Sequence, residues 1–279
     1  MHLRLNRTAT VILGAAVLVA VGGGGEWVRA DFGVGASARV LRDERRGMSF
    51  PGSGAQAAIG LLGEFRVALG DVAWIGMSHC WEEYDPVGTL RGLRLATALN
   101  PGSLYFCLNG ARILAYDFAA WRIQEAESVG HVPEAEKERI AREQGWEAVR
   151  FLEAGILQFP GKALPLIELA QVRLRCLHDS RGAAEAFARA ADCRDAPDYA
   201  SRIAAELLRN GGELLAARTL LEKRLRELKV SGVSLDQDRY SSERAVLESR
   251  LLSLKMDMDV AGYRDFTEES GERLEKDVE

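Results

Sequence analysis

The side chains best suited to chemistry in this sequence are its cysteines and histidines. Cys80, Cys107, Cys176 and Cys193 contain no C-x-x-C pair, and the four histidines stand apart from one another. Zinc sites and haem attachment depend on such short spacings, so the sequence predicts no metal and no cofactor. His79 adjoins Cys80, but neighbours on a helix diverge by about 100° and face apart. We therefore expect no catalytic residues.

The other candidates for a reactive site fail because of their surroundings. Gly22 to Gly25 lie in an apolar segment and lack the lysine that completes a phosphate-binding loop. The acidic pair Glu82 and Glu83 is expected to be solvated. Helical rise around a turn would place Cys176 and Cys193 over ~10 Å apart, beyond the ~7 Å limit for a disulfide. We expect buried thiols instead.

The elements that carry these residues repeat one spacing of small, apolar, small and proline residues. Offsets of four and three put such side chains on one face of a helix, where small residues let a neighbouring helix approach closely. The proline then ends the helix. Two full copies occur at Thr89/Leu93/Ala96/Pro101 and Ala148/Leu152/Gly155/Pro160. In a third copy, Ala183/Phe187/Ala190/Pro197, the proline comes two residues late, and in a fourth, Ala216/Leu220/Lys223, a lysine takes the last small position. The pattern predicts an all-α fold of stacked helical hairpins.

These repeats resemble the tetratricopeptide repeat (TPR) family over residues 60 to 228. Ala148, Ala183 and Ala216 are separated by 35 and 33 residues, close to the family period of about 34. The resemblance implies a TPR-like helical-hairpin solenoid, to which the apolar residues 8–28 add a predicted N-terminal transmembrane helix. Three further stretches are similar to membrane-anchored bacterial TPR proteins of unassigned function, namely Leu69 to Ile75, Trp81 to Asp85 and Leu99 to Pro101.

The TPR resemblance also implies a concave groove that binds a partner. In the family, the first helix of each repeat lines this groove. The same phase in this sequence gives Tyr105, Leu108, Arg112 and Tyr116 in one helix and Gln171, Leu174 and Arg175 in the next. Guanidinium groups bind carboxylates bidentately, which suits an acidic or C-terminal peptide. In the alternative interpretation, Tyr105 and Tyr116 pack in the core and Arg112 pairs with a neighbouring acid.

The composition indicates an ordinary folded protein whose acidity is confined to its end. The chain has 279 residues, 47% of them hydrophobic and 28% charged, and a net charge of −5. Residues 241–279 hold eleven acids and six bases, so residues 1–240 are balanced. No basic surplus remains to bind a phosphate backbone, and we expect no nucleic-acid partner.

The N-terminal segment is apolar enough to enter a membrane. Residues 8–28 contain one charge, Glu26, and can just cross a bilayer. We predict that residues 1–28 form a membrane anchor in a single-pass protein of the bacterial inner membrane, with the solenoid in the periplasm. A cleaved signal peptide is the alternative, although its A-x-A site at 36–38 lies far beyond the apolar run.

Glycine, proline and charge divide the rest of the chain. We predict a flexible linker at 29–58, a solenoid at 59–258 with an insertion at 126–144, and an acidic tail at 259–279. The expected helices and hairpins are 57–84, 87–99, 102–125, 163–193 and 198–228, followed by a capping helix at 241–256. Trp74, Trp81, Trp121 and Trp146 are expected in the core, and Gly60, Gly63, Gly70 and Gly76 at close helix contacts.

These observations predict a non-catalytic, membrane-tethered TPR-like scaffold that mediates protein–protein interaction in the bacterial cell envelope. Its partner is a protein or peptide, and residues 8–28 hold it to the membrane. The alternative is an accessory subunit of an envelope enzyme or transport complex. In that case the partner supplies the reactive residues, and the acidic tail or the insertion supplies the contact.

Overall fold

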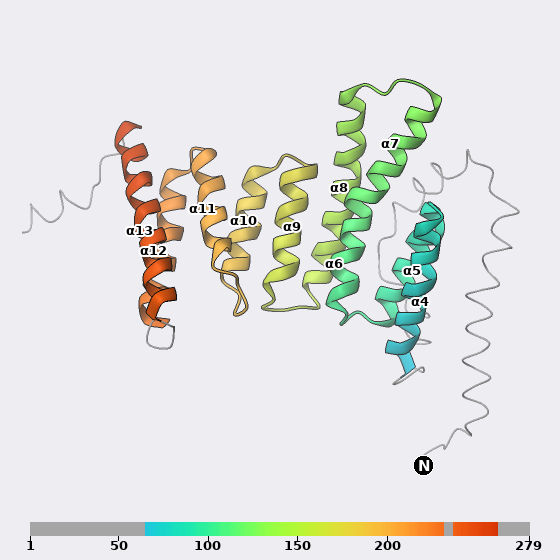
Figure 1. Cartoon of the computed structure of the whole chain (residues 1–279), viewed down its shortest axis with the longest axis horizontal. Coiled ribbons are helices and arrows are strands. Elements are labelled where there is room, and N and C mark those ends of the chain that lie inside the picture. The colour runs from blue at the N-terminus through green and yellow to red at the C-terminus, as the bar shows by residue number, and fades with distance from the viewer. Residues whose placement is uncertain (1–64, 232–236, 262–279) are drawn as a thin grey trace, which may run out of the picture. The chain divides into compact units, whose positions relative to one another are not determined.

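The structure is a computed structural model that describes residues 65–231 and 237–261. Every regular element in these two ranges is a helix, with no strand among them (Figure 1). The all-α prediction is therefore confirmed. None of the helices described is long and apolar enough to cross a membrane. The predicted anchor at 1–28, the predicted linker at 29–58 and the tail beyond residue 261 lie outside the described residues.

The helices divide into two compact units, one ending at Pro160 and the other beginning at Gly161. Unit 1 contains α4 (Phe65–Glu82), α5 (Pro86–Leu99), α6 (Leu104–Arg112), the π-helix η2 (Ile113–Asp117), α7 (Phe118–Val129) and α8 (Glu134–Ile156). Unit 2 contains α9 (Ala163–Cys176), α10 (Ser180–Ala191), α11 (Tyr199–Asn210), α12 (Leu214–Ser231) and α13 (Gln237–Val260). Within unit 2, each helix packs against the next one in the sequence.

Helix starts are fixed by local capping that the sequence signals directly. The Asp85 carboxylate accepts hydrogen bonds from the backbone N–H groups of Val87 and Gly88, each at 3.0 Å, and Pro86 is the first residue of α5. Asp179 caps α10 in the same way through the N–H of Gly182 at 2.8 Å. Such caps satisfy N–H groups that have no partner within the helix.

The start of α9 is capped from a distance. The Asp195 carboxylate, in the loop after α10, accepts a hydrogen bond from the Ala163 N–H at 2.9 Å. This bond holds the pKa of Asp195 below its ordinary value, and Lys162 adds to the effect. The loop between the two hairpins of unit 2 is thereby tied back to the first residue of the unit's first helix.

The faces predicted from the first three repeat copies are buried. The exposed fractions are 0% for Thr89, Leu93, Ala96, Ala148, Leu152, Ala183 and Ala190, and 4% for Phe187. Gly155 supplies the remaining small position. A Cβ atom at Gly155 would lie 2.5 Å from the Cys107 Sγ, so α6 and α8 can approach this closely only because position 155 lacks a side chain.

The fourth copy is displaced by one residue from its predicted register. Ala216 is exposed, whereas Ala217 and Leu221 are 0% and 3% exposed. The buried anchors Ala183 and Ala217 are therefore 34 residues apart, which equals the tetratricopeptide period. The sequence offered two adjacent alanines, and only packing against α11 and α13 distinguishes them. Arg224 takes the last small position and pairs with Asp198 at 3.0 Å.

Two other packing predictions need correction. Trp81 and Trp146 are 40% and 46% exposed, so they are not core residues. Trp74 and Trp121 are half-buried. In α4, the apolar residues Phe65 and Ile75 are 60% and 69% exposed, because this helix packs mainly against α5 and buries only one stripe.

The helix boundaries are predicted best where a proline or a cap marks them. The predicted helix 102–125 is a longer helical run interrupted by η2, and α13 extends four residues beyond both predicted ends. The end of the predicted insertion is also packed more tightly than expected. Ile140 and Gln144 are 3% and 7% exposed on α8, where they face η2 and α7.

The α4–α5 contact gives a direct test of close helix approach. A Cβ added at Gly92 would lie 2.4 Å from the Met77 Cβ and 2.9 Å from the Met77 Cα, so α4 and α5 would have to separate. We expect Gly92→Ala to destabilise the protein by about 1–3 kcal/mol. Gly76, predicted to be a contact glycine, faces open space, and Gly76→Ala should stabilise the helix by about 0.5–1 kcal/mol.

Thermal and urea unfolding of both variants measures this difference. Equal effects of the two substitutions would contradict the packing described for α4 and α5. Gly70 is a contact glycine as predicted, since its added Cβ would lie 2.9 Å from the Asn100 Cβ. Gly60 and Gly63 lie outside the described residues.

Candidate functional site

The predicted groove residues of unit 1 lie on α6 and η2. Tyr105 is 60% exposed, Arg112 is exposed and Tyr116 is half-buried. The Tyr105 ring packs edge-on against Trp74, with ring centroids 5.4 Å apart, and Trp74 in turn stacks on Phe106 at 4.6 Å. Tyr105 thus supports the α4–α6 contact with one ring edge and leaves most of its surface in solvent.

The other predicted groove residues lie on α9 in unit 2. Gln171 is half-buried and Arg175 is exposed. Arg112 and Arg175 belong to different units, so their action as a joint carboxylate clamp stays a prediction. Both residues are exposed, as a charge-assisted bond to a partner requires.

The π-helix lies among the predicted groove residues and depends on a residue from α8. The Phe118 N–H reaches the Ile113 carbonyl across the wide turn. Gln144, with its amide oriented from the hydrogen-bond network, donates to the Leu114 carbonyl at 3.3 Å and accepts from Arg122 Nη1 at 2.8 Å. Arg122 Nη2 forms an ion pair with the Glu143 carboxylate at 3.0 Å. A buried amide thus supports the irregular turn, a feature often found near functional positions.

A second tie joins the end of α4 to the π-helix. Trp81 Nε1 donates a hydrogen bond to the Asp117 carboxylate at 2.8 Å. Tyr84, in the left-handed region with φ of 56°, lies against Trp121 with ring centroids 5.5 Å apart. Trp121 also packs against Phe118, with a 5.2 Å centroid distance. These aromatic side chains hold the end of α4 against η2 and α7. Trp81 and Trp121 therefore stabilise a helix contact near the surface of unit 1.

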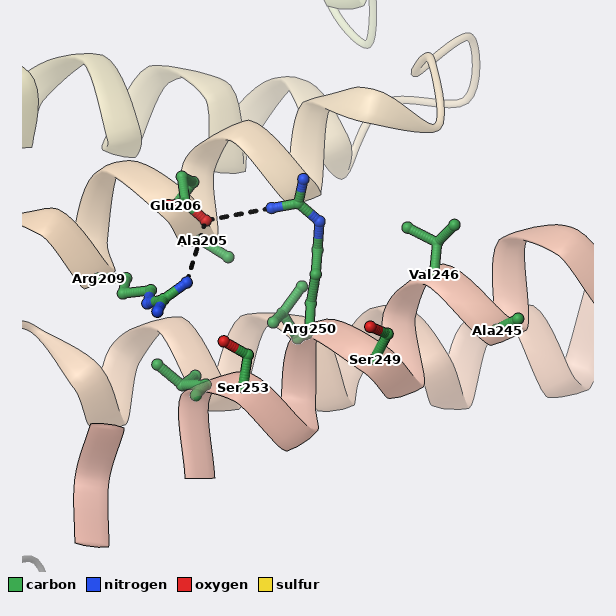
Figure 2. A pocket seen from close by; sticks show the side chains of 10 residues that line it. Ala205, Glu206, Arg209, Ala245, Val246, Ser249, Arg250 and Ser253 are labelled. Carbon is green, nitrogen blue, oxygen red and sulfur yellow. Dashed lines mark hydrogen bonds and ion pairs between the residues drawn. The ribbon is translucent and has the colours of Figure 1, made fainter. Parts of the chain in front are cut away.

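Unit 2 contains a cleft of about 580 Å³ (Figure 2). Its apolar floor comes from Ala205, Leu221 and Leu254, and its polar wall includes Ser249 and Ser253. Glu206, Arg209 and Arg250 stand at its rim, with Ala245 and Val246 completing the lining. The cleft therefore lies between α11 and α13, above the buried face of α12.

Three ion pairs connect α11 with α13. Arg202 pairs with Glu243 at 2.6 Å, Glu206 with Arg250 at 3.2 Å and Arg209 with Asp257 at 2.5 Å. The partners occur in the same order along both helices, so α11 and α13 run parallel. The Glu243 side chain is only 8% exposed, which makes its pair the least solvated of the three.

The pairing decides what the cleft can bind. Hydrogen bonding to Asp257 raises the pKa of Arg209, and Arg250 is already held by Glu206. A carboxylate ligand would have to displace one of these acids and regain the same charge-assisted bond. An uncharged side chain has no such competitor, and the alanine and leucine floor with nearby serine hydroxyls suits a small amphipathic group.

Two of the four cysteines, Cys176 and Cys193, have surroundings that oppose reactivity. Cys107 and Cys176 are buried and Cys80 and Cys193 are half-buried, which confirms the predicted burial for two of the four. Desolvation raises the pKa of Cys176, and desolvation together with Asp195 and Asp192 raises that of Cys193. Both thiols are therefore mostly protonated at neutral pH, and the thiolate is the nucleophile. Residues 65–231 and 237–261 contain no group of three potential metal ligands.

The sequence interpretation missed the cleft. Its charged partners are separated by 41, 44 and 48 residues, distances at which no local pattern signals a contact. The heptad spacing of Glu243, Arg250 and Asp257 along α13 is visible in the sequence. It indicates a charged stripe on one face of a helix, but not its partner.

No protein-family model matches this sequence, and no curated protein matches it either. Function is therefore inferred from the chain's own residues.

The ion pairs predict a measurable role for Glu243. Glu243→Ala leaves Arg202 without its carboxylate in a largely desolvated setting, so we expect a loss of about 1.5–3 kcal/mol in unfolding free energy. Hydrogen exchange should show α13 opening more readily than α11. The matched control is Glu222→Ala, which removes a half-exposed i,i+4 pair with Arg218 within one helix and should cost only about 0.3–0.5 kcal/mol. Equal losses in the two variants would contradict a structural role for the pair.

Proposed function

We propose that this protein is a non-catalytic, membrane-tethered TPR-like scaffold that recruits a protein partner through its helical hairpins. The observation that carries the proposal is the cleft between α11 and α13. Two parallel helices separated along the chain by one antiparallel helix form its walls, as expected for first helices of successive hairpins in a solenoid. The buried anchors, 34 residues apart, support the same architecture.

The chemistry of the cleft supports recognition of a peptide segment. Its apolar floor takes a small side chain, and its serine hydroxyls can bond to the backbone of an extended or helical segment. The rim charges are paired across the helices, so they set the shape of the opening and contribute little free charge. The exposed Arg112 and Arg175 supply separate charged contacts for acidic parts of the partner.

The membrane tether rests on the apolar sequence of residues 8–28. A tether restricts the scaffold to the membrane surface and raises the effective concentration for partners anchored beside it. The predicted location is the bacterial inner membrane, with the helical units in the periplasm.

Filling the cleft tests partner recruitment. Ser253→Trp places an indole against the apolar floor, and we expect recovery of the partner after chemical cross-linking in membranes to fall at least about tenfold, or ~1.4 kcal/mol. The partner is a polypeptide other than this chain, identified by mass spectrometry. Thr219→Trp, at an exposed position on α12, adds the same bulk away from the cleft and should leave recovery unchanged.

The outcomes of that experiment separate the interpretations. If one protein that is cross-linked stoichiometrically to the wild type is lost with Ser253→Trp but not with Thr219→Trp, the scaffold proposal is supported and that protein is the partner. If the variant retains all of its cross-linked proteins while its melting temperature is unchanged, the cleft is not the recruiting surface. Recovery of a complete enzyme or transporter in fixed stoichiometry would favour the accessory-subunit alternative.

The tether is tested by fractionation. The full chain should sediment with membranes and resist extraction by high salt, because burial of an apolar segment is insensitive to screening. Deleting residues 1–28 should release a strongly helical protein into the soluble fraction, as measured by circular dichroism. A full chain that salt removes from membranes would contradict an inserted anchor and indicate an electrostatic attachment.

A further inference from the structure

The outer face of α13 carries an apolar stripe that no described helix covers. Leu252, Met256 and Val260 are 64%, 63% and 91% exposed. Ala245 and Ser249, which also line the edge of the cleft, are exposed and continue the stripe toward the start of the helix. At about 100° per residue, these five positions fall within roughly 80° of one another around the helix. The buried residues Leu247, Leu254 and Met258 lie on the opposite side and join α13 to the core of unit 2.

The stripe has small residues at one end and larger ones at the other. Ala245 and Ser249 lie in its first half, and Met256 and Val260 lie in its second half. When two copies pack antiparallel, the small end of one helix meets the large end of the other. Val260 then faces Ala245, Met256 faces Ser249, and Leu252 lies near the two-fold axis. Alternation of large and small side chains is how helix faces interlock.

A charged row along one edge of the stripe has an order that also complements itself. It reads Arg244, Glu248, Lys255 and Asp259, and all four side chains are exposed. Reversal of the row places Asp259 opposite Arg244 and Lys255 opposite Glu248. Both pairs are centred between residues 251 and 252, close to the centre of the apolar pairs. In a parallel arrangement this row would face the opposite edge of the second helix, where Val246 and Ser253 lie, and the charges would find no partners there.

We propose that α13 is a homodimerisation helix, which packs antiparallel against α13 of a second copy about a two-fold axis near Leu252. The interface is isologous, so each ion pair occurs twice. Residues 244–260 span about 24 Å, enough for several turns of contact. Arg244 and Glu248 pair within one helix at 2.7 Å in the single chain, an exposed contact that exchanges readily for one across the interface. The proposal does not depend on the scaffold function, but a second copy would cover Ala245 and Ser249 at the edge of the cleft and would compete there with a bound partner.

The mass of the full chain in a mild detergent, measured by light scattering with correction for the detergent, tests the apolar contact. We expect a dimer for the wild type and a monomer for Leu252→Asp at the same concentration, with dissociation at least about a hundredfold easier, or ~2.7 kcal/mol. Leu252 is exposed, so the variant should keep its melting temperature apart from the contribution of association. Leu215→Asp on α12, where the leucine is 55% exposed, is the matched control and should remain dimeric.

Charge exchange tests the antiparallel register. Arg244→Glu places an acid opposite Asp259 of the second copy and should weaken the dimer by roughly tenfold, or ~1.4 kcal/mol. The double variant Arg244→Glu with Asp259→Arg should restore it. Residues 244 and 259 are about 22 Å apart along one helix, so they cannot restore each other within a chain.

Each result either supports or overturns the dimer. A wild type that is monomeric at every concentration measured overturns it, whether residues 262–279 or a different protein covers the stripe. A dimer that survives Leu252→Asp must use another surface. If the double variant does not recover the dimer stability that Arg244→Glu removed, the antiparallel register is excluded. Melting curves of all variants establish that the monomer fold is intact.

Discussion

The close approach of helix backbones is the constraint on which both units depend. In unit 1, a side chain at Gly92 would come within 2.4 Å of Met77, and one at Gly110 within 2.6 Å of Leu93 and 3.0 Å of Phe151. In unit 2, alanines at 0% exposure take the same role on α10, α11 and α12. Short interhelix distances let modest apolar side chains fill the core, because dispersion contacts weaken quickly as a gap opens. The small residues of the repeated spacing therefore mark the positions at which neighbouring helix backbones lie close together.

That constraint explains which features the sequence predicts. The hairpins α9–α10 and α11–α12 follow from small residues at helical spacing, from the cap Asp179 and from the glycine turn after Asn210, all of which act within a few residues. The register of the fourth copy does not follow, because Ala216 and Ala217 both satisfy the local rule. The π-helix does not follow either. Its turn widens between α6 and α7, and its support comes from Gln144 on another helix.

The candidate site was hard to predict for a related reason. The phase assigned to Tyr105, Arg112 and Tyr116 assumes 3.6 residues per turn, and η2 departs from that period between Arg112 and Asp117. In unit 2, the rim of the cleft is built from arginines whose partners lie more than forty residues away. Sequence shows which residues can carry charge on a helix face. Tertiary packing decides whether that charge is offered to a ligand or used to hold two helices together, and around the cleft it is used for the latter.

Those ion pairs bear on the orientation of α13. Glu243, Arg250 and Asp257 are seven residues apart, so they form a nearly straight line along the helix, with a drift of about 20° per heptad. Pairing of all three with α11 favours one rotation of α13 about its own axis. Burial of Leu247, Leu254 and Met258 is the larger constraint, because ion pairs as exposed as Glu206–Arg250 and Arg209–Asp257 contribute at most about 1 kcal/mol each. The residues that face outward on α13 are therefore determined by apolar burial, and the ion pairs reinforce the same orientation.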